Sequence, residues 1–284
     1  MSLYSIKDLQ TLSGIKAHTI RMWEKRYDLL QPSRNENQKR SYDSEELKKL
    51  LNISILYNAG WKISKIAALS KKEIQDEMNT ISQDYRSKSA VVTLFIEALL
   101  AFDHIKFERI LNKTIEKEGF EAAYINYLLP FLERIGVLWI LNTISPAQEH
   151  FISNIIRQKM IVAINQFTPA DHSDVDYLLF TPSGEFHEIG LLYHQLQLCK
   201  KGNNVIYLGV DVPVSSVIKT IEQLNPKNLL FSMVVAQEEY TVNAIFTTLR
   251  NATPAPLFVS GSFIEQIKLP KVGNVFYAKT LFNV

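Results

Sequence analysis

The sequence has one cysteine, Cys199, and no long hydrophobic run among its 284 residues. A single cysteine excludes a disulfide framework within the chain and a cysteine-based zinc finger, and it is typical of a reducing compartment. No apolar stretch approaches the roughly 18 to 20 residues that span a bilayer. The polar first residues also lack the charged and apolar regions of a signal peptide. We therefore expect a cytoplasmic protein without a membrane partner.

The chain also lacks any tract of biased composition, and its two signs of charge almost balance. Apolar side chains make up 46% and charged ones 21%, and at about 100 to 200 residues per domain the length allows two domains or three small ones. The charge is unevenly distributed, because residues 1–72 hold 14 Lys and Arg against 7 Asp and Glu, whereas residues 73–284 hold 17 against 22. A basic head favours binding to a large anion such as DNA, although a solvated lysine-rich surface would give the same counts.

Apolar spacing in the head predicts two short helices, through Ile6 to Leu12 and through Ile20 to Tyr27, and a longer one over residues 44–59. Ser13-Gly14 is a turn signal between the first two. This is the helix-turn-helix pattern, in which the second helix enters the major groove of DNA. The basic, irregular segment over residues 32–42 indicates a wing.

These residues resemble the MerR family of winged helix-turn-helix regulators. The family pattern stands here as Thr19-Ile20-Arg21-Met22-Trp23-Glu24-Lys25-Arg26-Tyr27-Asp28-Leu29-Leu30-Gln31-Pro32-Ser33-Arg34, followed by Arg40-Ser41-Tyr42. The resemblance implies an operator of double-stranded DNA, read by a homo-oligomer, with core positions at Ile20 and Trp23. It implies DNA contacts at His18, Thr19, Arg21, Arg26, Arg40 and Tyr42. A protein-binding helical module remains the alternative.

We place the DNA-binding domain at residues 1–72, a polar linker at 73–89 and a four-helix bundle cap at 90–168, where apolar residues recur at spacings of three and four. The last bundle helix is expected to open with Ser145-Pro146-Ala147-Gln148, a capping-box arrangement with proline at the first helical position. Glu149 and His150 then fall in its first turn, close to the point where Trp139 ends the preceding helix.

From residue 169 onward, short apolar runs alternate with amphipathic helical segments, which predicts a doubly wound, Rossmann-like α/β domain with a five-stranded parallel sheet. The expected strands span residues 176–181, 204–208, 228–235, 256–259 and 274–278. Ligands of such sheets bind at the carboxyl ends of the strands. The loops that follow Phe180, Leu208, Val234 and Val259 are therefore the expected binding surface.

The first of these loops contains Glu185-Phe186-His187-Glu188-Ile189-Gly190. A histidine with a carboxylate two residues earlier can bind a metal through one ring nitrogen while the other is oriented by hydrogen bonding. On its own the pattern is weak, because a lone histidine is more often structural. Further along, 41 residues separate Gly190 from Ser232, and 26 separate Val234 from Gly261.

This spacing resembles the cobalamin-binding domain of methionine synthase, the mutases and related regulators, whose signature is Asp-x-His-x-x-Gly, Ser-x-Leu and Gly-Gly. The resemblance implies that His187 is the lower cobalt ligand and that Glu185 tunes it through a hydrogen bond. It also implies that Ser232, Val234 and Gly261 line the slot for the displaced nucleotide tail, with Gly190 completing the first motif. Ser262 stands where the family has its second glycine.

Trp139 lies ten residues before Glu149-His150, and this spacing is similar to that of the CarH/LitR light-responsive repressors. The resemblance implies that Trp139, Glu149 and His150 face the upper ligand of adenosylcobalamin, whose photolysis shifts the cap and releases the oligomer from DNA. Ile140 stands where that group has a histidine that can ligate cobalt after photolysis. Either His150 replaces it or no such adduct forms.

The expected function is that of a transcriptional regulator, most consistent with a repressor, which senses adenosylcobalamin and light and changes its oligomeric state, as a homo-dimer or tetramer, and its DNA affinity. We expect no enzymatic activity, because a cobalamin-dependent methyltransferase or mutase component would need no DNA-binding head, and the chain has no catalytic domain to hold a second substrate. The alternative is a MerR-type regulator whose cobalamin-like domain binds another tetrapyrrole or serves only in assembly.

Overall fold

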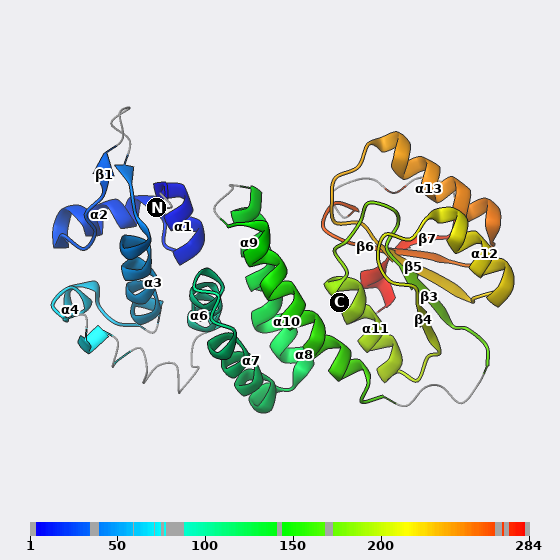
Figure 1. Cartoon of the computed structure of the whole chain (residues 1–284), viewed down its shortest axis with the longest axis horizontal. Helices are drawn as coiled ribbons and strands as arrows, with labels where there is room; N and C mark the ends of the chain where they lie inside the picture. The colour runs from blue at the N-terminus through cyan, green and yellow to red at the C-terminus, as the bar shows by residue number, and fades with distance from the viewer. Residues whose placement is uncertain are drawn as a thin grey trace. The chain divides into compact units, whose positions relative to one another are not determined.

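A computed structural model of the whole chain gives the fold (Figure 1). It describes residues 4–34, 40–58, 60–70, 72–74, 77, 88–140, 144–167, 173–264, 269 and 273–281. The chain divides into two compact units, Met1–Ile155 and Ile156–Val284. Within the described ranges, the helices are all too short or too polar to cross a membrane.

The first unit begins with the two short helices that the apolar spacing predicts, α1 (Ile6–Ser13) and α2 (Ala17–Tyr27). A capping box starts α1, because the Ser5 hydroxyl accepts from the Asp8 amide at 3.3 Å and the Asp8 carboxylate accepts from the Ser5 amide at 2.7 Å. The helix ends at Gly14, whose φ of 73° is left-handed and favours glycine. The helix-turn-helix prediction is confirmed.

A short wing and two further helices complete the head. Strands β1 (Ser33–Arg34) and β2 (Arg40–Ser41) pair antiparallel, and residues 35–39 of the expected wing lie outside the described ranges. Next come α3 (Ser44–Asn58) and α4 (Ile63–Ile66). The spacing predicts α3 but not the four-residue α4. Most of the segment expected to be a linker also lies outside the described residues.

The bundle contains the four predicted helical segments. Its elements are α6 (Lys88–Leu100), α7 (His104–Glu118), α8 (Phe120–Ala123), η1 (Tyr124–Leu128), α9 (Leu129–Ile140) and α10 (Pro146–Ile164). The rings of Phe95, Phe107 and Phe131 form its centre, with centroids 4.5 to 5.5 Å apart. The third segment runs through α8, η1 and α9, and η1 is a π-helical turn that the sequence does not predict.

The last bundle helix begins as its capping sequence predicts. The amide of Ser145 donates to the Gln148 side chain at 2.9 Å, and the amide of Gln148 donates to the Ser145 hydroxyl at 3.3 Å. Head and bundle also pack on each other, with α3 along α6 and α1 against α9 (Figure 1). A Cβ atom at Gly14 would lie 2.4 Å from Nη2 of Arg134 on α9, so this turn of the head closely contacts the bundle.

The second unit is the predicted doubly wound domain. Its strands are β3 (Tyr177–Phe180), β4 (Val205–Tyr207), β5 (Asn228–Ser232), β6 (Leu257–Ser260) and β7 (Val275–Tyr277). All neighbours pair parallel in the order β4-β3-β5-β6-β7. The strand order reverses between β3 and β5, and such a switch point opens a crevice beyond the carboxyl ends of the strands.

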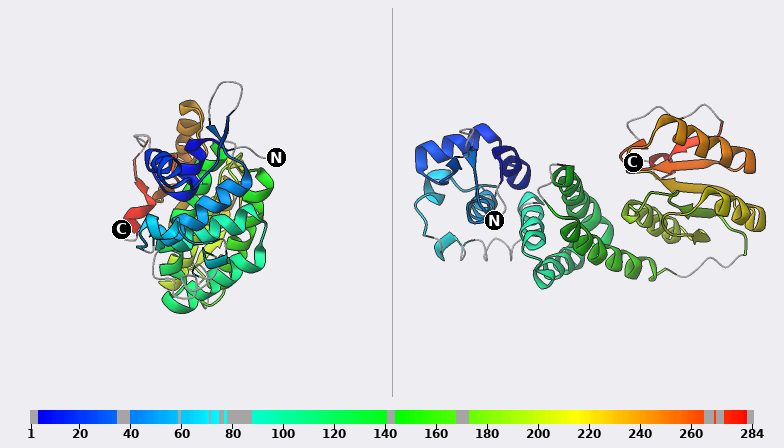
Figure 2. Two further views of the ribbon diagram at one scale, coloured as in Figure 1. Left: turned by 90° about the vertical axis from the view of Figure 1, so that its left-hand side faces the viewer. Right: turned by 45° about the horizontal axis from the view of Figure 1, so that its top comes forward.

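Helices cover both faces of this sheet (Figure 2). Side chains of α12 (Val214–Leu224) and α13 (Glu239–Ala252) pack on one face with Leu229 and Phe231 of β5. Those of α11 (Ile189–Lys200) pack on the other face with Leu230. The 3-10 turn η3 (Ala278–Leu281) follows β7 and adds Ala278 to the second cluster.

Candidate functional site

Glu185 organises the loop that follows β3. Its side chain is only 2% exposed, and its carboxylate accepts from the amides of Val234 at 2.6 Å, Val235 at 2.9 Å and His187 at 2.9 Å. Burial alone raises the pKa of Glu185, but the hydrogen bonds from His187, Val235 and Val234 outweigh it and lower the pKa to about 2. Glu185 is therefore an ionised carboxylate that joins the first expected loop to the loop after β5.

The same carboxylate orients the ring of His187. Nδ1 of His187 lies 2.7 Å from Oε1 of Glu185, and the imidazole side chain remains 51% exposed. Because an ionised carboxylate can only accept, Nδ1 is the nitrogen that carries a proton in this contact, and Nε2 is the ring nitrogen left for a metal. This is the arrangement by which a carboxylate prepares a histidine for a metal.

The other expected cobalamin residues lie at the same edge of the sheet. Ser232 ends β5, is buried, and is the register partner of Ser260 on β6. At Gly261 the φ is +112°, and a Cβ atom there would lie 2.2 Å from the carbonyl oxygen of Met233. Glycine is thus required by the chain itself at this position. Ser262, which follows it, is exposed.

Gly190 differs from Gly261, because its surroundings are open. It lies in the first turn of α11, where a Cβ atom would meet nothing within 4 Å. A glycine inside a helix costs roughly 1 kcal/mol relative to alanine, and no packing within the described chain requires it. The Cβ position of Gly190 is therefore open and exposed.

Glu188 is a site residue that sequence reasoning misses. Its carboxylate accepts a hydrogen bond from the Tyr207 hydroxyl and pairs with Nε of Arg157 on α10. Burial, followed by the bond to Glu188, raises the pKa of Tyr207. An acidic residue directly after His187 is the only sequence signal, since nothing in the spacing connects it with Arg157 or Tyr207.

The expected cap residues lie in the first unit. Trp139 belongs to the last turn of α9, and its side chain is outside what the structure describes. Glu149 lies in the first turn of α10, where its carboxylate accepts from the Ser153 hydroxyl at 2.5 Å and lies 2.9 Å from Nδ1 of His150. The His150 side chain is 73% exposed. The structure thus brings Glu149 and His150 together.

On the head, the expected DNA contacts separate into exposed and buried groups. His18, Arg21 and Arg26 are exposed on α2 and Thr19 is half-buried, whereas Ile20 and Trp23 are core, as expected. Tyr42 is fully buried and donates its hydroxyl to Glu24 at 3.1 Å. Glu24 also pairs with Arg40 at 2.9 Å. Since a buried ring cannot reach DNA, Tyr42 is corrected from a DNA contact to a support for Glu24 and Arg40.

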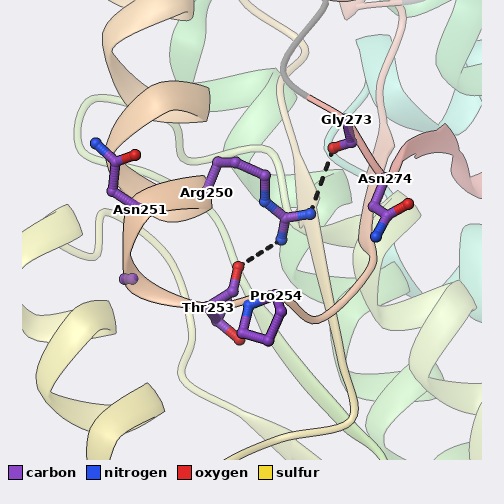
Figure 3. Close-up of a pocket in the computed structure, with 7 residues that line it drawn as sticks. Arg250, Asn251, Thr253, Pro254, Gly273 and Asn274 are labelled. Atoms are coloured by element: carbon purple, nitrogen blue, oxygen red, sulfur yellow. Dashed lines mark hydrogen bonds between the residues drawn. The ribbon is translucent and has the colours of Figure 1, made fainter.

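A hollow of about 410 Å³ lies at the opposite edge of the sheet, beside the starts of β6 and β7 (Figure 3). Arg250 crosses it and donates to the carbonyl oxygens of Thr253 at 2.7 Å, Gly273 at 3.3 Å and Ala255. These bonds connect the end of α13 to the loops before the two strands. The hollow therefore has a structural explanation and lies away from the edge that carries His187.

Two families match parts of the chain. The profile of the MerR HTH family regulatory protein matches residues 4–73, and that of the B12 binding domain matches residues 91–163, over the bundle. The HTH-type transcriptional repressor CarA of Myxococcus xanthus is 29% identical over 260 residues, which are 90% of this chain and 85% of CarA. The chain is a homologue of this repressor. CarH of the same organism is 27% identical over 267 residues, 91% of this chain and 89% of CarH.

The fold also resembles a solved corrinoid protein. The monomethylamine corrinoid protein of Methanosarcina barkeri superposes with a TM-score of 0.50 at 15% identity, over 63% of this chain and 88% of that chain. The resemblance to MerR regulators with a cobalamin-binding region is confirmed. The named relatives are transcriptional repressors and not enzymes, which agrees with the expectation from the sequence.

Proposed function

We propose that this chain is a cytoplasmic, DNA-binding transcriptional repressor that binds cobalamin in its α/β domain. The ligand is adenosylcobalamin, and its state, changed by light, alters the oligomerisation of the chain and its affinity for an operator. The coarser part of this proposal, a DNA-binding regulator with a cobalamin-binding region, follows from the family matches and the homologous repressors. The adenosyl form, the light response and the homo-oligomer are the finer part.

The observation that carries the proposal is the pair formed by Glu185 and His187 at the switch point of the sheet. Among the described residues, no three His, Cys, Asp or Glu side chains converge as a metal site. The pair therefore suits a metal that brings its other ligands with it, as cobalt does in a corrin. The open space at Gly190 and the close packing at Gly261 fit a large, flat ligand with a tail.

Each residue then has a defined task. His187 would hold cobalt through Nε2, Glu185 would keep the ring in that orientation, and Ser232, Val234, Gly261 and Ser262 would line the tail slot. Trp139, Glu149 and His150 would cover the upper ligand. When bound, adenosylcobalamin supplies a cobalt–carbon bond that light can break. His150, whose side chain is exposed in the first turn of α10, would take the part of the histidine that Ile140 replaces.

The head supports the DNA-binding half of the proposal. Exposed His18, Arg21 and Arg26, with half-buried Thr19, lie on the second helix of the helix-turn-helix, the element that enters the major groove. Arg40 extends from the wing, where Glu24 holds its guanidinium. A cationic face of this kind contacts phosphates, and MerR-type heads read paired half-sites, which supports a homo-dimer or tetramer.

The test is an absorbance spectrum of the purified protein incubated with adenosylcobalamin in the dark and again after green illumination, with the oligomeric mass measured on the same samples. We expect bound corrinoid in the dark, and a change in both spectrum and mass after light. The variant His187→Ala removes the proposed cobalt ligand and should therefore lose axial ligation. Binding without any response to light would contradict the photoreceptor part. Failure to bind would favour another tetrapyrrole or a role in assembly, as Ser262 and Ile140 suggest.

A further inference from the structure

Ser260, at the end of β6, has a buried hydroxyl that the fold does not use. The residue is 7% exposed, and within the described part of the chain its Oγ is buried without a hydrogen-bond partner. Its backbone carbonyl, in contrast, accepts from the amide of Met233 at 2.9 Å. Buried hydroxyls are nearly always paired, and an unpaired one costs about 1 to 3 kcal/mol. The sequence motifs do not include this residue.

The alternation of the strands defines the face to which Ser260 belongs. Leu257 and Val259 pack in the cluster under α12 and α13, whereas Phe258 packs with the cluster under α11. Side chains two residues apart in a strand share a face, so Ser260 lies on the α11 face. By the same rule, Ser232 shares the α11 face with Leu230 of β5. Ser232 and Ser260 are register partners on adjacent parallel strands.

The two serines therefore form a small polar surface at the carboxyl edge of the sheet, on the face covered by α11. Gly190 is on that helix, with open space where a Cβ atom would be. Gly261 follows Ser260 directly and brings β6 against the carbonyl of Met233. A ligand segment that passes between α11 and the sheet at this edge would meet both hydroxyls.

We propose that the hydroxyl of Ser260 forms a hydrogen bond with a polar group of the nucleotide tail of cobalamin, beside Ser232. This inference rests on the proposed function and goes beyond it, because it adds a residue that discriminates corrinoids with a tail from corrinoids without one. The bond would pair a buried hydroxyl that has no partner among the described residues. Ser260 and Ser262 flank Gly261, so Ser260 adds a second hydroxyl to this segment. Ser262 is the residue that stands where the family has its second glycine.

The test compares two corrinoids, adenosylcobalamin and adenosylcobinamide, which has the same corrin and upper ligand but no nucleotide tail. The dissociation constants of both are measured in the dark for the full chain and for Ser260→Ala. We expect Ser260→Ala to weaken adenosylcobalamin binding about threefold to tenfold, the size of one hydrogen bond. Adenosylcobinamide binding should be unchanged. Ser215→Ala is the matched control, because that serine is exposed on α12 and has no part in the proposed site.

A second measurement separates this role from a structural one. Removing an unpaired buried hydroxyl should leave the melting temperature of the ligand-free protein unchanged or raise it, whereas a supporting hydroxyl would lower it on removal. Equal effects on the two corrinoids, or a lower melting temperature with unchanged affinities, would overturn the role of Ser260. If the unmodified chain binds neither corrinoid, the proposed function fails together with this inference.

Discussion

Arg157 of α10 forms an ion pair with Glu188, the residue that follows His187. The Glu188 side chain is 13% exposed, and its other oxygen accepts from Tyr207 at the end of β4. Arg157, in the part of α10 that belongs to the second unit, thus contacts the loop that carries the expected cobalt ligand.

Tyr207→Phe should lower the free energy of unfolding by about 1 to 2 kcal/mol, because the carboxylate of Glu188 would lose a charge-assisted hydrogen bond in a half-buried place. Urea unfolding of the ligand-free protein measures it. Tyr240→Phe is the matched control, since Tyr240 is 82% exposed, and it should change the unfolding free energy little. Equal effects of the two variants would contradict the importance of the Glu188 contact.

Acid should destabilise the second unit through Glu185. The pKa of this carboxyl is lowered from 4.5 to about 2, so its ionised form stabilises the fold above pH 4.5 and this contribution is lost as the pH falls toward 2. The loss amounts to about 3 kcal/mol by linkage. Urea titrations across this pH range should show it, and Glu185→Gln should remove it.

Glu116→Gln, at an exposed position of α7, is the control for that experiment. Its unfolding profile should follow that of the unmodified chain at every pH. If Glu185→Gln retains the full loss of stability in acid, other carboxylates cause it and the assignment to Glu185 is wrong.

Arg21→Ala and Arg40→Ala should weaken DNA binding and reduce its dependence on salt. Each phosphate contact that is lost lowers the slope of log affinity against log salt by about 0.9 for double-stranded DNA. Anisotropy titrations at several salt concentrations measure the slope. Arg109→Ala, at an exposed position of α7, should bind as the unmodified chain does. A slope that stays constant in Arg21→Ala would sink its assignment as a phosphate contact.

Gly261→Ala should destabilise the protein by more than about 2 kcal/mol, because it combines a left-handed φ with a clash against the backbone of Met233. Gly202→Ala separates the two causes, since Gly202 has a φ of +79° but open space around its Cβ position. The difference between the two variants in thermal unfolding reports the clash together with the larger φ of Gly261. Similar losses of stability in both variants would show that the backbone at Met233 shifts to accommodate the added Cβ atom without destabilising the fold.

The parts of the fold that depend on local pattern could be predicted from the sequence. Capping at Ser145 and alternation along the strands act within a few residues, and they give α10 and the parallel sheet. The pair of Glu185 and His187 was also accessible, because its two members lie two residues apart. Bonds to Val234 and Val235 depend on how β5 lies beside β3, which no spacing in the chain reports.

Other features could not be predicted because distant segments cause them. Tyr42 looks like a surface residue in the wing motif. Packing in the head buries it, and its hydroxyl donates a hydrogen bond to Glu24. The contact of Arg157 with Glu188 joins residues 31 positions apart. Ser260 shows the reverse case, because a serine at a strand end is unremarkable until its neighbours reveal that nothing in the described chain pairs with it.

The π-helical turn at Tyr124–Leu128 determines the rotational phase of α9. A π turn holds one residue more than an α-helical turn, and each residue turns an α-helix by about 100°. Deleting one residue from this turn would rotate α9 by that angle relative to α8 and carry Arg134 away from Gly14. The angular setting of α9 thus depends on the number of residues in this turn.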